Sequence, residues 1–235
     1  DHLPLYRQRQ IFLRAGVDLS RSTLSDWIGR CGVELERLTD ALRKVILQQA
    51  VIHADETPVT IMRMDDKDKK PKKGYVWAYA TTQYNPVQAV IYDFQDSRSG
   101  EHAEAFLKDW QGHLVCDDYS GYKARFKSGQ VIEVGCMAHA RRKFHELHVT
   151  GKSQIAEQAL FLIQKLYAIE AEIRKNTDGT AEQRYKYRQQ YSQAVMQQLY
   201  EWLTQHQLAV PSSSATAKAI NYSLKRWEAL SRYLD

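Results

Sequence analysis

The sequence predicts an α/β protein in which helices cover a mixed sheet and further helical segments flank it. Three observations support this class. Residues 51–94 contain three short apolar runs of strand character in succession, which is typical of an antiparallel meander. Residues 97–152 then alternate between helical and strand patterns, which favours a mixed sheet with helices on its faces. Residues 1–50 and 153–235 show mainly helical periodicity.

The composition is that of an ordinary globular chain. Hydrophobic residues make up 43% and charged residues 26% of the 235 positions, which excludes global disorder and fibrous proteins. The uncharged apolar stretches are far shorter than the ~20 residues of a membrane helix, so no membrane partner is expected. Three widely spaced cysteines indicate a reducing compartment, and we expect a cytoplasmic protein. The net charge is +5, and the surplus falls within residues 61–235, which hints at an acidic partner.

The first fifty residues predict two helices. Residues 3–15 form the first, and Gly16 suits its C-terminal cap. The second begins near Ser22, with Thr23 and Asp26 at capping-box-like spacing. Helix, turn and helix is the outline of a DNA-binding helix-turn-helix, and also of a helical hairpin that only packs.

The second predicted helix carries an apolar repeat of seven residues. This spacing can serve a dimer seam, although Gly29, Gly32 and Glu34 weaken it. The repeat consists of Leu24, Cys31, Leu38 and Val45, with Trp27, Ile28, Leu35 and Leu42 on the same face.

Three strands are predicted next, over residues 51–55, 74–82 and 89–94, and the first ends at Asp55. The aromatic face of the second strand is more typical of a core than of a base-stacking surface; it consists of Tyr75, Trp77 and Tyr79. The charged residues 63–73 predict a solvated loop, in which Lys67 to Lys73 serve either DNA contact or solubility.

Helices and strands then alternate, and the fourth strand runs directly into Asp117. In order, the sequence predicts a helix capped by residues 97–100, a strand over 113–116, a helical segment over 119–126, a strand over 131–134 and a helix from Met137.

The remainder predicts a long helical hairpin, in which Thr180 restarts a helix after a break, and a last helix through Trp227 and Leu230. The chain therefore divides into four segments: 1–50, 51–152, 153–209 and 210–235.

Asp55 and Asp117 stand where predicted strands end, a position that is held by a sheet and open to solvent. Two converging carboxylates repel each other, and a divalent cation such as Mg²⁺ or Mn²⁺ resolves that repulsion. Paired ions of this kind support in-line phosphoryl displacement. The alternative is that each aspartate only closes a strand. Strand alternation points Glu56, and by the same reasoning Asp118, elsewhere.

Several stretches, in the right order, resemble successive motifs of one known family. These stretches are His53–Val59, Ser97–Gly100, Cys116–Tyr122 and Gly135–Phe144, preceded by His2–Arg7 and Arg21–Leu24 and followed by Asn221–Leu230. Together they resemble the insertion-sequence-66 family of bacterial DDE transposases, over nearly the whole chain.

The resemblance implies a ribonuclease-H-like catalytic core with a five-stranded mixed sheet, N-terminal helices and an inserted helical hairpin. It implies that Asp55 and Asp117 are catalytic ligands of Mg²⁺ or Mn²⁺. The implied chemistry is metal-dependent cleavage of DNA by water, which frees a 3′-hydroxyl, followed by attack of that hydroxyl on target DNA. The implied partners are double-stranded transposon ends and target DNA, and the implied assembly is a homo-oligomer associated with the bacterial nucleoid.

Some family features are missing from the sequence. The third carboxylate of the family is a glutamate in an Asn-Asn-x-x-Glu-Arg type of motif after the last helix, which we expect beyond Asp235. Glu228 lies before that point and is not expected to replace it. No Cys-x-x-Cys of the family's zinc-binding segment occurs, and Met137 stands where an aromatic residue is usual. The resemblance therefore implies a fragment or shortened product with two of the three ligands.

The basic cluster at the start of the last predicted helix of the core has two interpretations. His139, Arg141, Arg142 and Lys143 contact DNA phosphates, or the cluster is only a solvated helix face. A zinc site built from Cys136, His139, His145 and His148 is a further alternative, although structural zinc needs four well-placed ligands.

Three functions follow from these observations. The first is a transposase core that needs the missing tail to be complete. The second is a truncated, catalytically incomplete protein that binds DNA, regulates or oligomerises. The third is a ribonuclease-H-like nuclease or junction resolvase.

Overall fold

The computed structural model describes residues 3–61, 71–176 and 179–235. The chain forms two compact units, Asp1–Leu47 and Gln48–Asp235, which we call the helical unit and the sheet unit. Among the described residues, no helix is both long enough and apolar enough to cross a membrane. The three cysteines are free thiols.

The helical unit consists of α1 (Leu5–Arg14) and the long helix α2 (Arg21–Leu47). Gly16 has a φ of +82°, the left-handed conformation predicted for the end of the first helix. The second helix starts next to the predicted Ser22, but its capping residue differs from the prediction. It begins at Arg21, and the Ser20 hydroxyl accepts a 3.0 Å hydrogen bond from the Thr23 amide, so Ser20 is its cap.

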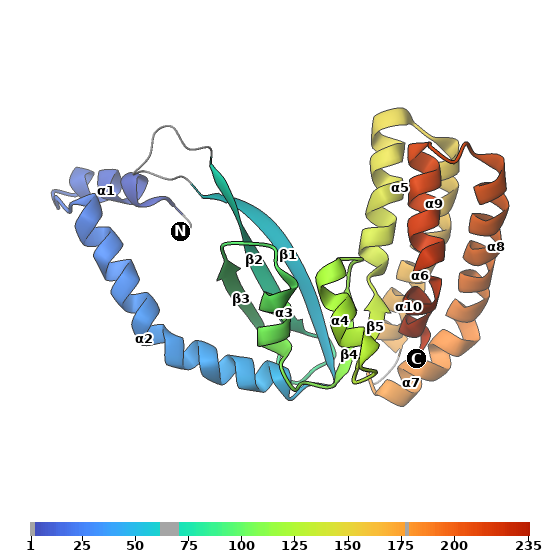
Figure 1. Cartoon of the computed structure of the whole chain (residues 1–235), viewed down its shortest axis with the longest axis horizontal. Coiled ribbons are helices and arrows are strands. Elements are labelled where there is room, and N and C mark those ends of the chain that lie inside the picture. The colour runs from blue at the N-terminus through green and yellow to red at the C-terminus, as the bar shows by residue number, and fades with distance from the viewer. Residues whose placement is uncertain (1–2, 62–70, 177–178) are drawn as a thin grey trace. The chain divides into compact units, whose positions relative to one another are not determined.

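The sheet unit contains a five-stranded mixed sheet with the order β3-β2-β1-β4-β5 (Figure 1). The first three strands pair antiparallel, and β4 joins β1 and β5 in parallel. With its flanking helices this is a ribonuclease-H-like fold, which confirms the predicted fold class. The strands are β1 (Val51–Ile61), β2 (Lys72–Thr81), β3 (Val90–Gln95), β4 (Gly112–Cys116) and β5 (Val131–Gly135).

The prediction that the first strand ends at Asp55 is wrong. β1 continues to Ile61 because β2 pairs with it along this whole length, from Thr81 opposite Ile52 to Lys72 opposite Ile61. Lys72 and its neighbour therefore lie in a strand and not in the predicted loop. The rest of that charged segment, residues 62–70, lies outside the described residues.

The aromatic face of β2 lies in the core, as predicted. Trp77 and Tyr79 are fully buried, and the Tyr79 ring stacks on Phe106 with 3.6 Å between ring centroids. The ring of Trp77 lies edge-on to Tyr119 and Tyr122 in the segment after β4, with centroid distances of 5.7 and 6.1 Å. These contacts fix the position of that segment against the sheet.

Short helical segments follow the strands of the core, and longer helices form a bundle beside the sheet (Figure 1). The short segments are α3 (Gly100–Leu107), capped by Ser99, the 3₁₀ turn Ser120–Tyr122 and α4 (Lys123–Lys127). The bundle region consists of α5 (Met137–Gly151), α6 (Gln154–Asn176), the short α7 (Ala181–Tyr187) with the π-helical segment Arg188–Ser192, α8 (Gln193–Ala209) and α9 (Ala215–Lys225).

The bundle has its own apolar core, to which α5, α6, α8 and α9 all contribute. Its larger members, all buried, are Phe144, Ile163, Leu166, Met196, Leu199, Leu203 and Ile220. The Thr180 hydroxyl accepts a hydrogen bond from the Gln183 amide at the start of α7, as the sequence predicted.

The last predicted helix is not continuous. It breaks at Arg226, whose backbone leaves the helical region with φ −110° and ψ 15°, and resumes as α10 (Trp227–Ser231). A 3₁₀ turn, Arg232–Leu234, follows. The break lets α10 pack directly on β5, where a Cβ added to Gly135 would lie 2.9 Å from a Leu230 methyl carbon.

We predict that Gly112→Ala lowers the free energy of unfolding by about 2–4 kcal/mol. Gly112 has a φ of +151°, and an added Cβ would lie 2.5 Å from the Ala50 carbonyl oxygen. Urea unfolding followed by circular dichroism measures the change. Gly151→Ala is the control, because a Cβ there meets nothing within 4 Å. Equal midpoints for the two variants would contradict this account of Gly112.

Candidate functional site

The parallel pairing of β1 with β4 places Asp55 and Asp117 at the same level of the sheet. The paired positions, Val51 with His113 through His53 with Val115, are all 62 residues apart in sequence. Asp55 and Asp117 have the same separation and stand two positions beyond the last pair. Parallel neighbours at equal register lie on the same face, so both carboxylates occupy one edge of this strand pair.

The Asp55 side chain is open to solvent, with 52% of its surface exposed. One of its oxygens accepts a 3.0 Å hydrogen bond from the Glu56 amide, and the same oxygen lies 3.8 Å from Nε2 of His139. β1 therefore supplies the carboxylate, while the first turn of α5 supplies an imidazole beside it.

His139 is held by its own helix as well as by the site. Interaction with the Cys136 side chain, at the start of α5, raises the pKa of His139, and Asp55 and Asp117 raise it further. Burial alone would raise the pKa of the Cys136 thiol, but its interactions with His139 outweigh burial and lower that pKa. The imidazole thus stands within electrostatic reach of both predicted site carboxylates.

Asp117 lies at the start of a tightly held turn. One of its oxygens accepts a 2.8 Å hydrogen bond from the Tyr119 amide. The Tyr119 hydroxyl donates to the Arg98 carbonyl, and the Arg98 guanidinium lies over the Tyr119 ring at 4.3 Å. These contacts fix the backbone that carries Asp117 to the segment before α3.

Glu56 points to the opposite face of β1 from Asp55, as strand alternation predicted, and is buried. The Arg98 guanidinium donates to it over 3.0 Å and the Tyr122 hydroxyl over 3.2 Å. Burial raises the pKa of Glu56, and the hydrogen bond from Arg98 opposes that effect. Glu56 therefore anchors the turn after Asp117 from inside the core and is not open to a ligand.

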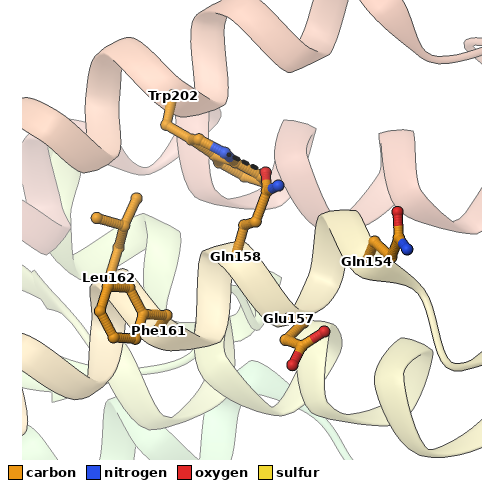
Figure 2. A pocket seen from close by; sticks show the side chains of 6 residues that line it. All are labelled: Gln154, Glu157, Gln158, Phe161, Leu162 and Trp202. Atoms are coloured by element: carbon orange, nitrogen blue, oxygen red, sulfur yellow. Dashed lines mark hydrogen bonds between the residues drawn. The ribbon is translucent and has the colours of Figure 1, made fainter.

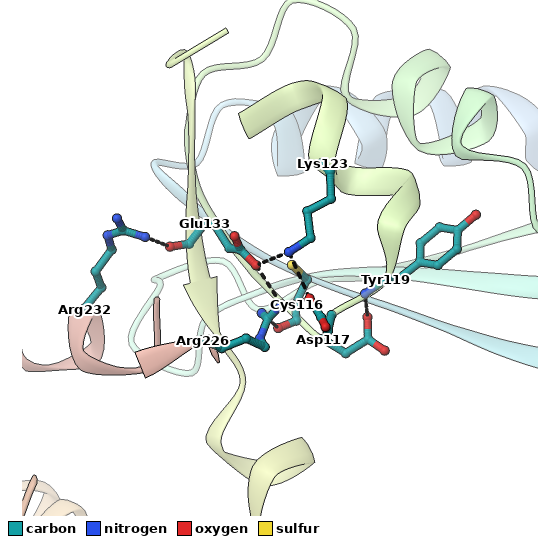
Figure 3. A network of polar contacts seen from close by, with 8 residues as sticks. Cys116, Asp117, Tyr119, Lys123, Glu133, Arg226 and Arg232 are labelled. Carbon is teal, nitrogen blue, oxygen red and sulfur yellow. Dashed lines mark hydrogen bonds and ion pairs between the residues drawn. The ribbon is translucent and has the colours of Figure 1, made fainter. Parts of the chain in front are cut away.

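A second polar network fixes the other side of the turn (Figure 3). Arg226, at the break between α9 and α10, is almost fully buried and lies 2.9 Å from Asp118 and 2.7 Å from Glu133. It also donates to the Cys116 carbonyl over 3.2 Å. Lys123 joins the same two carboxylates at 2.9 and 3.1 Å.

The electrostatics of this network agree with its geometry. Burial alone would raise the pKa of Asp118, but hydrogen bonds from Lys123 and Arg226 lower it below its usual value. Burial raises the pKa of the Cys116 thiol to about 12, so this cysteine is an inert core residue. Asp118, like Glu56, therefore serves to hold the backbone beside Asp117.

The structure separates the predicted basic cluster into different environments. His139 lies against Asp55, whereas Arg141 and Arg142 are exposed on the outer surface of α5. Lys143 is half-buried, with its ammonium 4.4 Å from the centre of the Tyr222 ring of α9. Burial, helped by the Asp117 charge and opposed by that of Arg226, raises the pKa of Tyr222 to about 12, so α9 borders the site.

Among the residues that the structure describes, no group of three or more His, Cys, Asp or Glu side chains is placed to hold a metal ion. The zinc alternative at Cys136 and the nearby histidines is therefore not supported. Asp55 and Asp117 offer two carboxylates, and Mg²⁺ usually takes one or two and completes its shell with water and substrate phosphates. The donor set fits a hard divalent cation of that kind.

A separate open pocket lies on the helical bundle, between α6 and α8 (Figure 2). The Trp202 indole donates to the Gln158 side chain over 3.1 Å at its edge. None of the residues proposed for the site lines it: the lining consists of Gln154, Glu157, Gln158, Phe161, Leu162 and Trp202.

Sequence reasoning missed two residues that hold the site together. Arg98 lies within a stretch that the resemblance had marked, but only as part of a helix cap. Arg226 also lies within such a stretch, Asn221–Leu230, but nothing local indicated its role, because its partner Asp118 lies 108 residues away in sequence.

We predict that Arg226→Ala lowers the free energy of unfolding by about 2–4 kcal/mol, because it leaves Glu133 and the Cys116 carbonyl without their buried partner. Urea unfolding of the sheet unit measures the loss. Lys225→Ala is the matched control, since Lys225 is the exposed last residue of α9 and directly precedes Arg226. A loss no larger than that of the control would show that the network does not stabilise the fold.

The chain matches the family described as "Transposase IS66 family" over residues 1–235. An uncharacterized protein of Sinorhizobium fredii, y4qI, is 38% identical over 245 residues, covering 100% of this chain and 44% of the relative. A second, y4jD of the same organism, is 37% identical and covers 100% of this chain and 47% of the relative. The chain thus spans less than half the length of these relatives. On the match along its whole length, the chain belongs to the IS66 family of transposases.

Proposed function

We propose that this chain carries the catalytic core of a DDE-type transposase, which cleaves DNA and transfers the strand with the help of Mg²⁺ or Mn²⁺. The observation that carries the proposal is the shared register of Asp55 and Asp117 on β1 and at the end of β4. In this proposal both aspartates are catalytic metal ligands. Because the chain spans under half of its relatives, the activity is proposed for the protein to which the chain belongs.

The proposed ion would activate the attacking water or 3′-hydroxyl and stabilise charge on the phosphate. The residues of the chain itself position the reactants. The Glu56 and Arg98 contacts on one side, and the Arg226 network on the other, keep the turn after β4 rigid and Asp117 in place. His139 lies beside Asp55, where an imidazole can orient that carboxylate or a DNA phosphate.

We propose that His139, Arg141, Arg142 and Lys143 bind the phosphates of double-stranded DNA at transposon ends and target. Exposed arginines on the helix that also carries His139 favour this assignment. Such contacts give affinity without sequence information. We further propose a cytoplasmic, nucleoid-associated protein with four functional segments: 1–50 before the core, 51–152 as the core, 153–209 as a helical insertion and 210–235 leading to the third carboxylate.

A second candidate function is DNA binding, regulation or oligomerisation without cleavage. It is favoured by the finding that, within residues 3–61, 71–176 and 179–235, the acidic groups do not form a three-ligand site. Glu133 and Glu228 do not supply the third ligand readily, because each is paired with an arginine, Arg226 and Arg232 respectively.

Calorimetric titration with Mn²⁺ tests the metal site. We expect the chain to bind Mn²⁺, and Asp55→Asn and Asp117→Asn each to lose measurable binding, because each removes one of the two charged oxygen ligands. Asp118→Asn is the matched control, since its carboxylate already contacts Arg226 and Lys123, and we expect it to keep binding.

Two outcomes would count against the metal site. Equal binding by the chain and by both site variants would place the ion elsewhere. Loss of binding in Asp118→Asn alone would show that the ion binds at Asp118 and not at Asp55 and Asp117. If the chain binds Mn²⁺ as expected but the longer protein binds DNA without nicking it, the second candidate function is the correct one.

DNA binding is tested with the double variant Arg141→Ala/Arg142→Ala. Two lost phosphate contacts make the slope of log affinity against log salt shallower by roughly 1.8, and weaken binding at low salt. Fluorescence anisotropy with a labelled duplex measures both effects. The control is Arg174→Ala/Lys175→Ala, which removes two exposed charges at the end of α6. An identical slope for the two double variants would exclude the assignment to α5.

A further inference from the structure

The long helix α2 carries an apolar seam whose members follow one another at alternating intervals of four and three residues. We call Leu24, Ile28, Cys31, Leu35, Leu38 and Leu42 the α2 seam. This alternation is the spacing of a and d positions in a left-handed coiled coil. α2 runs without interruption from Arg21 to Leu47, through both glycines, so the whole seam lies on one helix (Figure 1).

Within the helical unit, described from residue 3 on, no side chain covers the middle of the seam. Ile28, Leu35 and Leu38 are 56%, 52% and 65% exposed, and only Leu24 and Ile46 of the entire helix are buried. Burying large apolar side chains of this kind is strongly favourable, while two glycines inside a helix weaken it. A helix of this composition therefore gains most of its stability from a partner that covers the seam.

The positions beside the seam favour a second copy of α2 as that partner. These e and g positions are Ser25, Trp27, Gly32, Glu34, Thr39 and Ala41. Only Glu34 among them is charged, so they provide little basis for selecting a different partner by complementary charge. In a parallel pair each g position meets the e position five residues later on the other helix. Trp27 then lies over the Gly32 of the other copy, a large side chain against an open site, and Glu34 meets Thr39.

The antiparallel alternative is less favourable. An antiparallel pair that overlaps along the whole seam has its two-fold axis near the middle of the seam. This arrangement brings the Glu34 side chains of the two copies together, and their like charges repel. We propose that α2 pairs in parallel and in register with the α2 of a second copy of this chain, through the α2 seam. This inference goes beyond the proposed function and does not depend on metal binding or DNA cleavage.

The association itself is tested by sedimentation equilibrium of the full 235-residue chain. We expect a dimer, and we expect Leu38→Lys to raise its dissociation constant at least about a hundredfold, because both copies lose a seam leucine. Val33→Lys is the matched control: Val33 is an exposed apolar residue of the same helix, 68% exposed, but lies off the seam. Circular dichroism at concentrations where each variant is still dimeric checks that the lysine does not unfold α2 by itself.

The register is tested through Cys31, the one exposed cysteine of the three in the sequence. In the parallel pair the two Cys31 thiols face each other across the seam, so a short bismaleimide joins two chains, and Cys31→Ser abolishes the product. A monomeric chain would overturn the proposal, as would a dimer that Leu38→Lys does not weaken. A dimer that Leu38→Lys weakens but the bismaleimide does not link would overturn the parallel register.

Discussion

The parallel hydrogen bonding between β1 and β4 is the constraint on which the candidate site depends. It is short, covering only Val51 to His53 on β1, yet it sets the level at which Asp55 and Asp117 stand on neighbouring strands. A slip of one residue would turn one of the two side chains to the other face of the sheet. β2 adds a second restraint, since its long antiparallel pairing continues along β1 past Asp55 to Ile61.

The turn after β4 is rigid because it is bound from two sides by buried ionic groups. On one side Glu56 and Arg98 connect the interior of the sheet to Tyr119 and Tyr122. On the other side Arg226 reaches from the break between α9 and α10 to the carbonyl of Cys116. Two of these charged residues, Glu56 and Arg226, are buried, so removing a partner would leave an uncompensated charge. Within the described part of the chain no ion pair involves Asp117, which lies between these two clusters.

The two units present different kinds of surface. In the sheet unit the bundle of α5, α6, α8 and α9 buries its apolar faces in one core, so its stability is internal. In the helical unit α2 keeps most of its apolar residues exposed along a regular seam. A regular exposed seam is informative in a way that scattered exposed leucines are not, because its period specifies the geometry of a partner.

The sequence by itself determined the order and type of nearly every element, because hydrophobic period and capping residues act within a few positions. It also determined the seven-residue repeat of α2 and the number of residues between Asp55 and Asp117 along the chain, which equals the offset of the paired positions in β1 and β4. It placed the end of β1 too early and missed the break at Arg226. Only the tertiary structure decided these features, since the length of β1 depends on pairing with β2, and two partners of Arg226, Asp118 and Cys116, lie more than a hundred residues away. Contacts distant in sequence also give the basic residues of α5 different environments. The fold brings His139 next to Asp55 and leaves Arg141 and Arg142 exposed on the surface.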